Sequence, residues 1–245
     1  MKKWPQEAYR WYRDACDMFN YPGLPYGNLI KELVSDSDRV LDIGCGIGVA
    51  SIMMSPWCRR VIAMDQDKNT LNCLEAEALA LGISNIEIVN DSWPLQMPIQ
   101  ADVIIALHVY NVMRSFDNLK LIFESANKGG FIACNALTCY QDEPFVELKE
   151  ELGIIPKHKM CANGCYIKGI MEAMGARVTC EKTIYEFGQP LDTFEEVVHF
   201  IQWQIMAEDS MIPIIGKYVD RYVNKTDGKY LVPITRHCCA ITFTK

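Results

Sequence analysis

Asp42 and three glycines stand close together in the segment Asp42-Ile43-Gly44-Cys45-Gly46-Ile47-Gly48. Glycine has no Cβ, so a turn built on Gly44 and Gly46 can bend sharply and bring its backbone close to a ligand. The apolar run after Gly48 predicts a helix, and the first N–H groups of a helix lack partners within it. Such N–H groups favour a bound anion or acceptor group. The segment therefore predicts a ligand-binding turn.

Carboxylates and a histidine at later positions could complete this site. Asp65 follows an apolar run, 21 residues after Gly44. A carboxylate at this place in a parallel α/β sheet can accept hydrogen bonds from both ribose hydroxyls, or it could cap the next helix, as Asp67 could. Asp91 follows the next apolar run and is either a ligand contact or a turn former. His108 ends the fourth run, at the edge where open α/β sheets bind ligands.

The elements that must position these residues alternate between strands and helices. Buried strands are predicted at 40–43, 61–64, 86–89, 102–107 and 131–137. Helices are predicted between them at 47–54, 68–81 and 116–127, and Lys128-Gly129-Gly130 is predicted to be a turn. Repeated strand–helix units demand a parallel sheet with right-handed crossovers.

The segments on either side of this core are less regular. Residues 4–34 are rich in aromatic side chains and predict helices at 7–18 and 27–34. This segment is either a hydrophobic brace on the sheet or a lid over the ligand. After residue 137 we expect a helix at 143–152, a loop at 153–165, and a helix that is capped by Asn163 and runs to Met174. A strand is predicted at 177–187 and a last strand at 230–243. Between these strands we expect a helix that begins with a capping box at Thr193 and a second helix at 211–222.

The glycine spacing points to one family. The dinucleotide fingerprint is G-x-G-x-x-G, and here Val49 breaks it. Asp42 and the three glycines instead form D-x-G-x-G-x-G, which resembles motif I of the class I S-adenosylmethionine (SAM) dependent methyltransferases. The acidic residues after strands two and three and the exit of strand four also follow in order. The resemblance implies a Rossmann-like α/β fold, with a doubly wound, mostly parallel seven-stranded sheet whose last strand runs antiparallel between two others, and with helical lid insertions.

The resemblance also implies how the site is used. The glycines would lie under the methionine part of SAM, Asp65 would bind the ribose, and Asp91 would accept from the adenine amino group. Trp93 could stack on the purine or pack in the core. The expected SAM-binding residues are Asp42, Gly44, Cys45, Gly46, Gly48, Asp65, Gln66, Asp91, Ser92, Trp93 and His108.

We expect a single domain at 1–245, with an N-terminal helical lid at 1–34, a SAM-binding core at 35–190, a helical insertion at 191–229 and the last strand at 230–245. The expected acceptor-binding residues are Tyr9, Tyr12, Phe200 and Trp203, which would line one apolar cavity with His108 at its floor, and Tyr110 and Asn111, which orient the acceptor or only shape the loop. The aromatic segments could instead pack the helices or form a homodimer contact.

The expected function is transfer of the SAM methyl group to a small molecule. The leaving group is already activated, so the protein mainly supplies proximity and orientation. His108 is the expected catalytic base where the acceptor carries a proton, or else it only contacts the cofactor or holds its loop. Two alternatives stay open: a protein or peptide methyltransferase, and a SAM-binding module without activity. The altered glycine spacing leaves only a weak case for an oxidoreductase.

Composition limits the partners. The chain has 245 residues, half of them apolar, a net charge of −7 and no basic tract, so we expect no nucleic-acid partner. It lacks a membrane-length apolar run and a signal peptide, and its eleven cysteines predict a cytoplasmic protein with free thiols. A soft metal or a metalloid substrate could bind to His158, Cys161, Cys165, Cys134 and Cys139. The paired C-x2-C spacing of structural zinc sites is missing, so no metal is expected. Cys45, Cys73, Cys134 and Cys180 are expected to be small core residues.

Overall fold

The fold is taken from a computed structural model that describes residues 4–94, 99–136, 145–154, 164–226 and 228–245. The chain divides into two compact units. The sheet unit comprises Pro22–Ala136, Cys161–Thr183 and His237–Lys245, and the second unit comprises Met1–Tyr21, Leu137–Met160 and Ile184–Arg236. Among the described residues, none of the helices combines the length and apolar character needed to span a bilayer.

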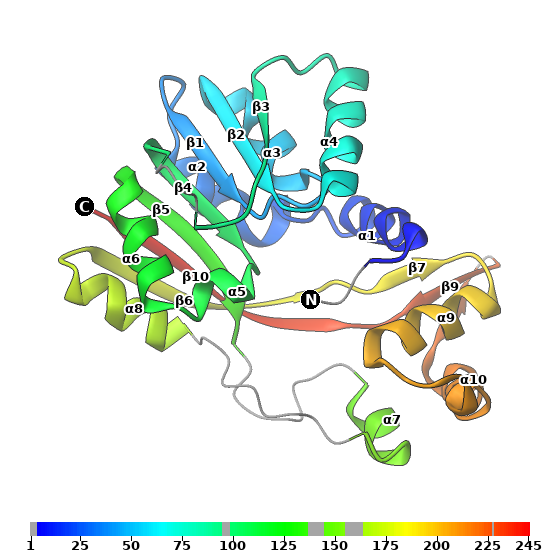
Figure 1. Cartoon of the computed structure of the whole chain (residues 1–245). Coiled ribbons are helices and arrows are strands. Elements are labelled where there is room, and N and C mark those ends of the chain that lie inside the picture. Colours follow the sequence, from blue (N-terminus) through cyan, green and yellow to red (C-terminus); the bar gives the residue numbers. More distant parts are fainter. Residues whose placement is uncertain (1–3, 95–98, 137–144, 155–163, 227) are drawn as a thin grey trace. The chain divides into compact units, whose positions relative to one another are not determined.

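A seven-stranded sheet in the order β3-β2-β1-β4-β5-β10-β6 organises the sheet unit (Figure 1). Its strands are β1 (Arg39–Ile43), β2 (Arg60–Asp65), β3 (Ile86–Asn90), β4 (Ala101–Leu107), β5 (Ala126–Asn135), β6 (Arg177–Glu186) and β10 (Thr235–Thr244). β1 to β5 pair in parallel, and β10 runs antiparallel to β5. The predicted sheet is confirmed, including the last strand inserted between two others.

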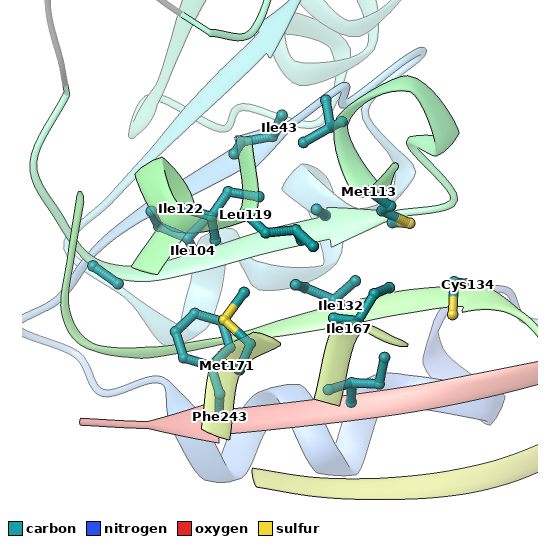
Figure 2. Close-up of a cluster of buried hydrophobic side chains, with 14 of the residues drawn as sticks. Ile43, Ile104, Met113, Leu119, Ile122, Ile132, Cys134, Ile167, Met171 and Phe243 are labelled. Atoms are coloured by element: carbon teal, nitrogen blue, oxygen red, sulfur yellow. The ribbon is translucent and has the colours of Figure 1, made fainter. Parts of the chain in front are cut away.

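Helices and a shared apolar core support this sheet. The helices are η1 (Gly23–Gly27), α2 (Asn28–Leu33), α3 (Val49–Met54), η2 (Ser55–Trp57), α4 (Lys68–Ala80), α5 (Tyr110–Met113), α6 (Phe116–Ser125) and α8 (Gly164–Ala173). Figure 2 shows Leu119 and Ile122 of α6 in one cluster with Ile167 and Met171 of α8 and with strand residues such as Ile104. Burying a side chain of this size stabilises the fold by about 1.5–3 kcal/mol.

The predicted turn at Lys128-Gly129-Gly130 is wrong, because these residues lie inside β5. A Cβ on Gly129 would collide with the backbone oxygen of Phe243, and one on Gly130 with that of Ile104. Glycine is needed here because the backbones of the neighbouring strands approach closely and leave no room for a Cβ.

The single last strand predicted at 230–243 is also wrong. It is divided into β9 (Lys229–Val232) and β10, with Pro233 between them. Proline has no N–H to donate to a ladder, so it tends to end a strand. β9 joins β7 (Gln189–Leu191) and β8 (Asn224–Thr226) in a three-stranded antiparallel sheet of the second unit. The apolar patterns of the sequence predict helices there but not this sheet, since its strands are only three or four residues long.

The helices of the second unit are α1 (Gln6–Met18), α7 (Val146–Glu151), α9 (Phe194–Ile205), η4 (Asp209–Met211) and α10 (Ile212–Tyr222). α9 begins as the capping box predicts, because Thr193 Oγ1 accepts from the Glu196 N–H at 3.1 Å. The Glu196 carboxylate accepts from the Asp192 N–H, one residue before the expected Thr193. The expected cap at Asn163 and the residues His158, Cys161 and Cys139 lie outside the described residues.

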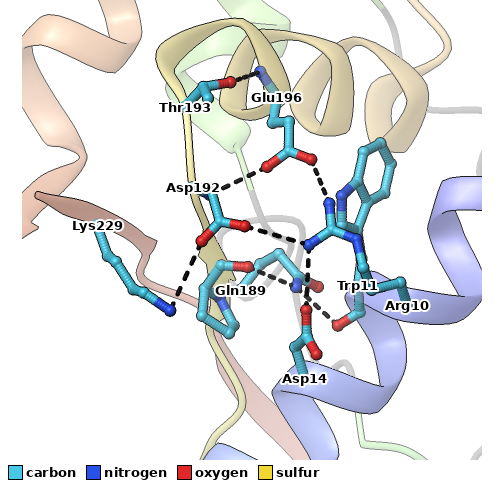
Figure 3. A network of polar contacts seen from close by, with 9 residues as sticks. Arg10, Trp11, Asp14, Gln189, Asp192, Thr193, Glu196 and Lys229 are labelled. Carbon is cyan, nitrogen blue, oxygen red and sulfur yellow. Dashed lines mark hydrogen bonds and ion pairs between the residues drawn. The ribbon is translucent and has the colours of Figure 1, made fainter.

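A polar network joins α1 to β7 and the start of α9 within the second unit (Figure 3). Arg10 pairs with Asp14, Asp192 and Glu196, and Lys229 pairs with Asp192 at 3.6 Å. The buried Gln189 donates from Nε2 to the Trp11 carbonyl oxygen at 2.7 Å. The exposed ion pairs contribute at most about 1 kcal/mol each. We therefore expect the buried hydrogen bond from the Gln189 side chain to matter more for the packing of α1 against β7.

Candidate cofactor-binding site

The predicted glycine turn links β1 to α3 in the sheet unit. Gly44, Gly46 and Gly48 all have left-handed backbones, with φ of 67°, 56° and 81°. The N–H groups of Gly44 and Cys45 donate to the Met64 carbonyl oxygen at 2.8 and 3.0 Å. These bonds fasten the turn to the end of β2, where the ribose-binding carboxylate was predicted.

The three glycines serve different purposes. A Cβ on Gly44 would lie 2.7 Å from Val109 Cγ2, and one on Gly48 would collide with the Leu74 side chain. Gly46 has nothing within 4 Å of that position. Gly44 and Gly48 are therefore required by packing, whereas the half-buried Gly46 leaves open space into which a ligand can fit.

Asp42 is buried under this turn. Ser51 Oγ, on the first turns of α3, donates to Asp42 Oδ2 at 2.6 Å. Burial raises the pKa of Asp42 to about 6, the Ser51 hydrogen bond opposes the rise, and the charge of Asp65 adds to it. Asp42 therefore braces the turn from below, and its contact with Ser51 links β1 to α3.

This raised pKa predicts a pH-dependent stability difference. The folded chain holds the Asp42 proton at a pH where the unfolded chain has lost it, so stability is lost as pH rises from about 4 to about 6. Asp42→Asn removes the titrating group and retains an oxygen that can accept from Ser51. We expect this variant to be more stable than wild type by about 1–3 kcal/mol at pH 8, and equally stable near pH 4. Urea unfolding at both pH values measures the difference.

Asp102 provides a control with the opposite sign. The Arg39 N–H donates to its carboxylate at 2.9 Å, and this bond lowers the pKa of Asp102. Asp102→Asn should lose more stability at pH 8 than at pH 4. A difference between Asp42→Asn and wild type that does not change with pH would contradict the assignment.

Asp65 ends β2 beside the open glycine. Its Oδ2 accepts from the Gly46 N–H and its Oδ1 from the Asp67 N–H, both at 2.9 Å. The cap of α4 is Asp67, whose side chain accepts from the Asn69 N–H. Each carboxylate oxygen can accept a second hydrogen bond, so Asp65 can hold the turn and still accept from a ligand. Gln66 follows it and is exposed.

Asp91 and Ser92 are exposed just after β3, and the Ser92 N–H donates to Asp91 Oδ1 at 2.7 Å. Trp93 packs against the apolar core, and its Nε1–H donates to the Asn118 carbonyl oxygen at 3.4 Å. This bond ties the Trp93 indole to α6, which supports the core interpretation of this residue. Asp91 therefore fits both predicted roles. Its Oδ1 accepts a hydrogen bond within the turn, as a turn former would, and the residue is exposed, so that Oδ2 could contact a ligand.

His108 follows β4 with a left-handed backbone, φ 57°. Its Nε2 lies 3.3 Å from the Tyr26 hydroxyl, and its Nδ1 lies 3.4 Å from the Tyr110 hydroxyl. Tyr110 in turn donates to Asn135 Oδ1 at 2.7 Å. Since that bond uses the Tyr110 proton, the arrangement favours a proton on His108 Nδ1 and a lone pair on Nε2 facing Tyr26.

Tyr26 and Asn135 are missed by the sequence patterns. Tyr26 is buried in η1, and Asn135 is the last residue of β5. Tyr26 precedes the helix predicted at 27–34, and Asn135 lies within the strand predicted at 131–137. Only the folded chain brings them to His108, which is 82 residues from Tyr26 and 27 residues from Asn135 in sequence. The sequence signal that could have pointed to Asn135 is its place at the carboxyl end of the strand next to β4.

The other predicted acceptor-binding residues fall in two places. Asn111 is exposed in α5 of the sheet unit, near Tyr110 in sequence. Tyr9, Tyr12, Phe200 and Trp203 belong to the second unit, where α1 and α9 bring them into one aromatic cluster. The predicted cavity that combines them with His108 involves both units and stays a prediction.

The cysteines are arranged as follows. Cys45 and Cys134 are buried as predicted, whereas Cys73 and Cys180 are only half-buried. Cys73 lies on α4 and Cys180 on β6, and neither side chain is fully covered by neighbouring elements, contrary to the prediction. Within the described ranges, no three His, Cys, Asp or Glu side chains are grouped so that they could hold a metal ion.

Sequence comparisons bear on the glycine turn directly. A family model described as Methyltransferase small domain matches residues 26–107, which contain the whole turn, Asp65 and Asp91. An uncharacterized protein of Haemophilus influenzae is 26% identical over 174 residues, which cover 69% of this chain and 63% of that protein. A ribosomal RNA small subunit methyltransferase A of Desulforapulum autotrophicum is 34% identical over 61 residues, covering 25% and 22%. The chain thus matches less than two thirds of the length of these relatives.

Solved structures agree on the fold. The YcgJ protein of Bacillus subtilis superimposes with a TM-score of 0.58 at 15% identity, covering 91% of this chain and 98% of that one. The magnesium protoporphyrin IX methyltransferase of Synechocystis PCC 6803, solved with bound SAH, gives a TM-score of 0.55 at 13% identity, covering 98% and 89%. Residues 26–107 therefore match a methyltransferase small domain, as D-x-G-x-G-x-G predicts, and the chain has the Rossmann-like fold seen in the Synechocystis methyltransferase.

Proposed function

We propose that the chain is an enzyme that transfers the methyl group of SAM to a small-molecule acceptor. The observation that carries this proposal is the pairing of Gly46 with Asp65. The glycine turn leaves open space at Gly46, and the Gly46 N–H fixes a carboxylate that still has lone pairs for a ligand. A ribose needs such an acceptor.

These residues fit SAM, and they would do three things. Gly44, Gly46 and Gly48 would shape the backbone beneath its methionine part, and Asp65 would accept from its ribose hydroxyls. Asp91 would accept from its adenine amino group. When bound, SAM supplies an activated methyl group. The protein then contributes orientation and the exclusion of water, which together can be worth several kcal/mol of the barrier.

His108 would take up a proton where the acceptor carries one. With the proton on Nδ1, its Nε2 lone pair would face the Tyr26 hydroxyl, which lies 3.3 Å away. This hydroxyl would then have to move aside or pass the proton on. Tyr110 can accept from His108 Nδ1, which would stabilise the charged ring formed when Nε2 is protonated. The two tyrosines orient the His108 ring, which is compatible with His108 as a base and with His108 as an anchor for its loop.

A variant pair separates these roles of His108. If it is a base, His108→Asn should lower kcat about 10²-fold or more, while the affinity for SAM changes less than about threefold. Steady-state kinetics and calorimetry measure the two effects. If His108 is only an anchor, both the melting temperature and SAM affinity should fall with kcat. Tyr110→Phe is the matched control, because it removes the contact to Nδ1 and Asn135 but keeps the ring.

The acceptor is proposed to be a small molecule because the net charge of −7 opposes a nucleic-acid backbone. The relative named as a ribosomal RNA methyltransferase favours the other candidate, an RNA acceptor, but it matches only 61 residues. The matched length is close to that of the SAM-binding strands and helices alone, which need not include acceptor-binding residues.

A screen with methyl-labelled SAM tests this choice. Small aromatic and aliphatic acceptors, a peptide pool and total RNA are incubated with the chain, and Asp65→Ala is the inactive control. We expect label in the small-molecule fraction only. Label in RNA would overturn the proposed acceptor class, and label in none of the fractions, with SAM bound, would favour the module without activity.

A further inference from the structure

The indole of Trp4 is enclosed by three aromatic side chains of the second unit. Tyr9 stacks on it with a centroid distance of 5.8 Å and an interplanar angle of 19°. Tyr12 meets it edge-on at 5.5 Å and 86°, and Trp203 meets it edge-on at 5.9 Å and 74°. One stacked and two edge-on partners are the arrangements that aromatic rings prefer. We call Tyr9, Tyr12 and Trp203 the aromatic box.

The box is held by rigid elements. Tyr9 and Tyr12 lie on α1 and Trp203 lies on α9, and both helices pack on one apolar core. Behind the box, Trp11 packs against Trp203 at 6.3 Å and against Phe200 at 5.7 Å. The side chains of the box are only partly buried, whereas Trp11 and Phe200 are buried. The box is thus firmly supported and lies at the margin of the core.

A buried polar atom in the same cluster is also informative. Trp11 is 1% exposed, and its Nε1–H has no hydrogen-bond partner among the described residues. A buried N–H without a partner costs about 1–3 kcal/mol. Such groups are rare in native proteins and often mark a place where a water or ligand is bound.

We propose that the aromatic box is a binding site for a planar aromatic ring, and that Trp4 fills it when the ring is absent. The contacts of the Trp4 indole stand in for those of the ligand: one face stacked on Tyr9, and edges against Tyr12 and Trp203. This ring-binding site lies wholly within the second unit and goes beyond the proposed function.

The structural alternative is specific. Trp4 precedes Pro5, the N-cap of α1, and Tyr9 is the fourth residue of the helix. A contact between these two positions is the hydrophobic staple, which fixes the direction of the chain entering a helix. A staple accounts for the contact with Tyr9, but it does not require the contact with Trp203 on α9. The two explanations differ in whether a free ring can displace Trp4.

Indole is the probe, because it is the ring now seated in the box. Wild-type chain labelled with 5-fluorotryptophan is titrated with indole and followed by fluorine NMR, and Trp4→Phe identifies the Trp4 signal. We expect the Trp4 signal to move towards its solvent-exposed position, while that of Trp57, which lies in the sheet unit, stays unchanged. Cyclohexanol, which has similar size but no planar ring, should bind at least about tenfold more weakly than indole.

Trp4→Ala gives the second arm. A site that is free for only a fraction of the time binds with an affinity reduced by that fraction, so removing Trp4 should tighten indole binding about tenfold by calorimetry. Tyr12→Leu in the Trp4→Ala background should undo this gain, and Tyr222→Ala on α10 is a matched control that should not. Binding of indole to Trp4→Ala alone would show only a cavity. Failure of indole to move the Trp4 signal in the wild type overturns the proposal.

Titration of the same proteins with SAM keeps this test apart from that of the proposed function. SAM binding with no displacement of Trp4 would refute the aromatic box and leave the methyltransferase proposal standing. Displacement of Trp4 without SAM binding would keep the box as a ring-binding site and refute the methyltransferase proposal.

Discussion

Asp65→Ala is expected to weaken SAM binding at least tenfold while the chain stays folded. A hydrogen bond to a charged group is worth about 1.5–3 kcal/mol, and the carboxylate would accept from the ribose hydroxyls. The same side chain accepts from the Gly46 N–H at 2.9 Å. Its loss therefore also removes a hydrogen bond that holds the glycine turn at Gly46, where the open space for a ligand lies. Calorimetry measures the affinity, and thermal melting measures the remaining stability.

Asp67→Ala is the matched control, two residues away. Asp67 caps α4, and loss of a cap costs about 0.5–2 kcal/mol of stability. We expect this variant to melt earlier and to bind SAM within about twofold of wild type. The opposite result, with Asp65→Ala losing stability and Asp67→Ala losing affinity, would mean that the roles of the two carboxylates are exchanged.

Gly48→Ala is expected to lower the free energy of unfolding by about 2–5 kcal/mol. A non-glycine residue in the left-handed region costs about 1–2 kcal/mol, and forcing a methyl group into a packed site costs about 1–3 more. Gly48 has φ 81°, and its Cβ would collide with Leu74, which is fully buried. Urea unfolding provides the measurement.

Gly46→Ala separates the two costs, since its φ is 56° but no atom lies within 4 Å of the added Cβ. It should lose only the backbone part, about 1–2 kcal/mol. The double variant Gly48→Ala with Leu74→Ala should be less damaging than the two single changes together, because the smaller residue makes room. Equal losses for Gly46→Ala and Gly48→Ala would show that the contact with Leu74 does not matter.

Much of the sheet unit could be predicted because local patterns and topology agree there. Short apolar runs of strand length alternate with helical periodicity, which permits few arrangements. The glycine turn was predictable for a related reason: its φ values are accessible mainly to glycine. The seven-stranded sheet and its antiparallel last strand follow from these features and are confirmed, and residues 26–107 match the methyltransferase small domain model.

The misses share a physical origin in contacts that sequence patterns do not contain. Gly129 and Gly130 resemble a turn locally, but neighbouring strands require them to be small. Pro233 divides the last strand, and its first part pairs in a different sheet. Tyr26 reaches His108 only through the fold. The backbone elements that carry the site could therefore be predicted from the sequence, but the side chains that contact His108 could be identified only in the structure.

The most direct test of the account is calorimetric titration of the wild-type chain with SAM and, separately, with NAD. The D-x-G-x-G-x-G turn, with open space at Gly46 and a carboxylate fixed beside it, predicts SAM binding in the micromolar range, about −8 kcal/mol, and no appreciable binding of NAD. Tight binding of NAD with no signal from SAM would contradict the account.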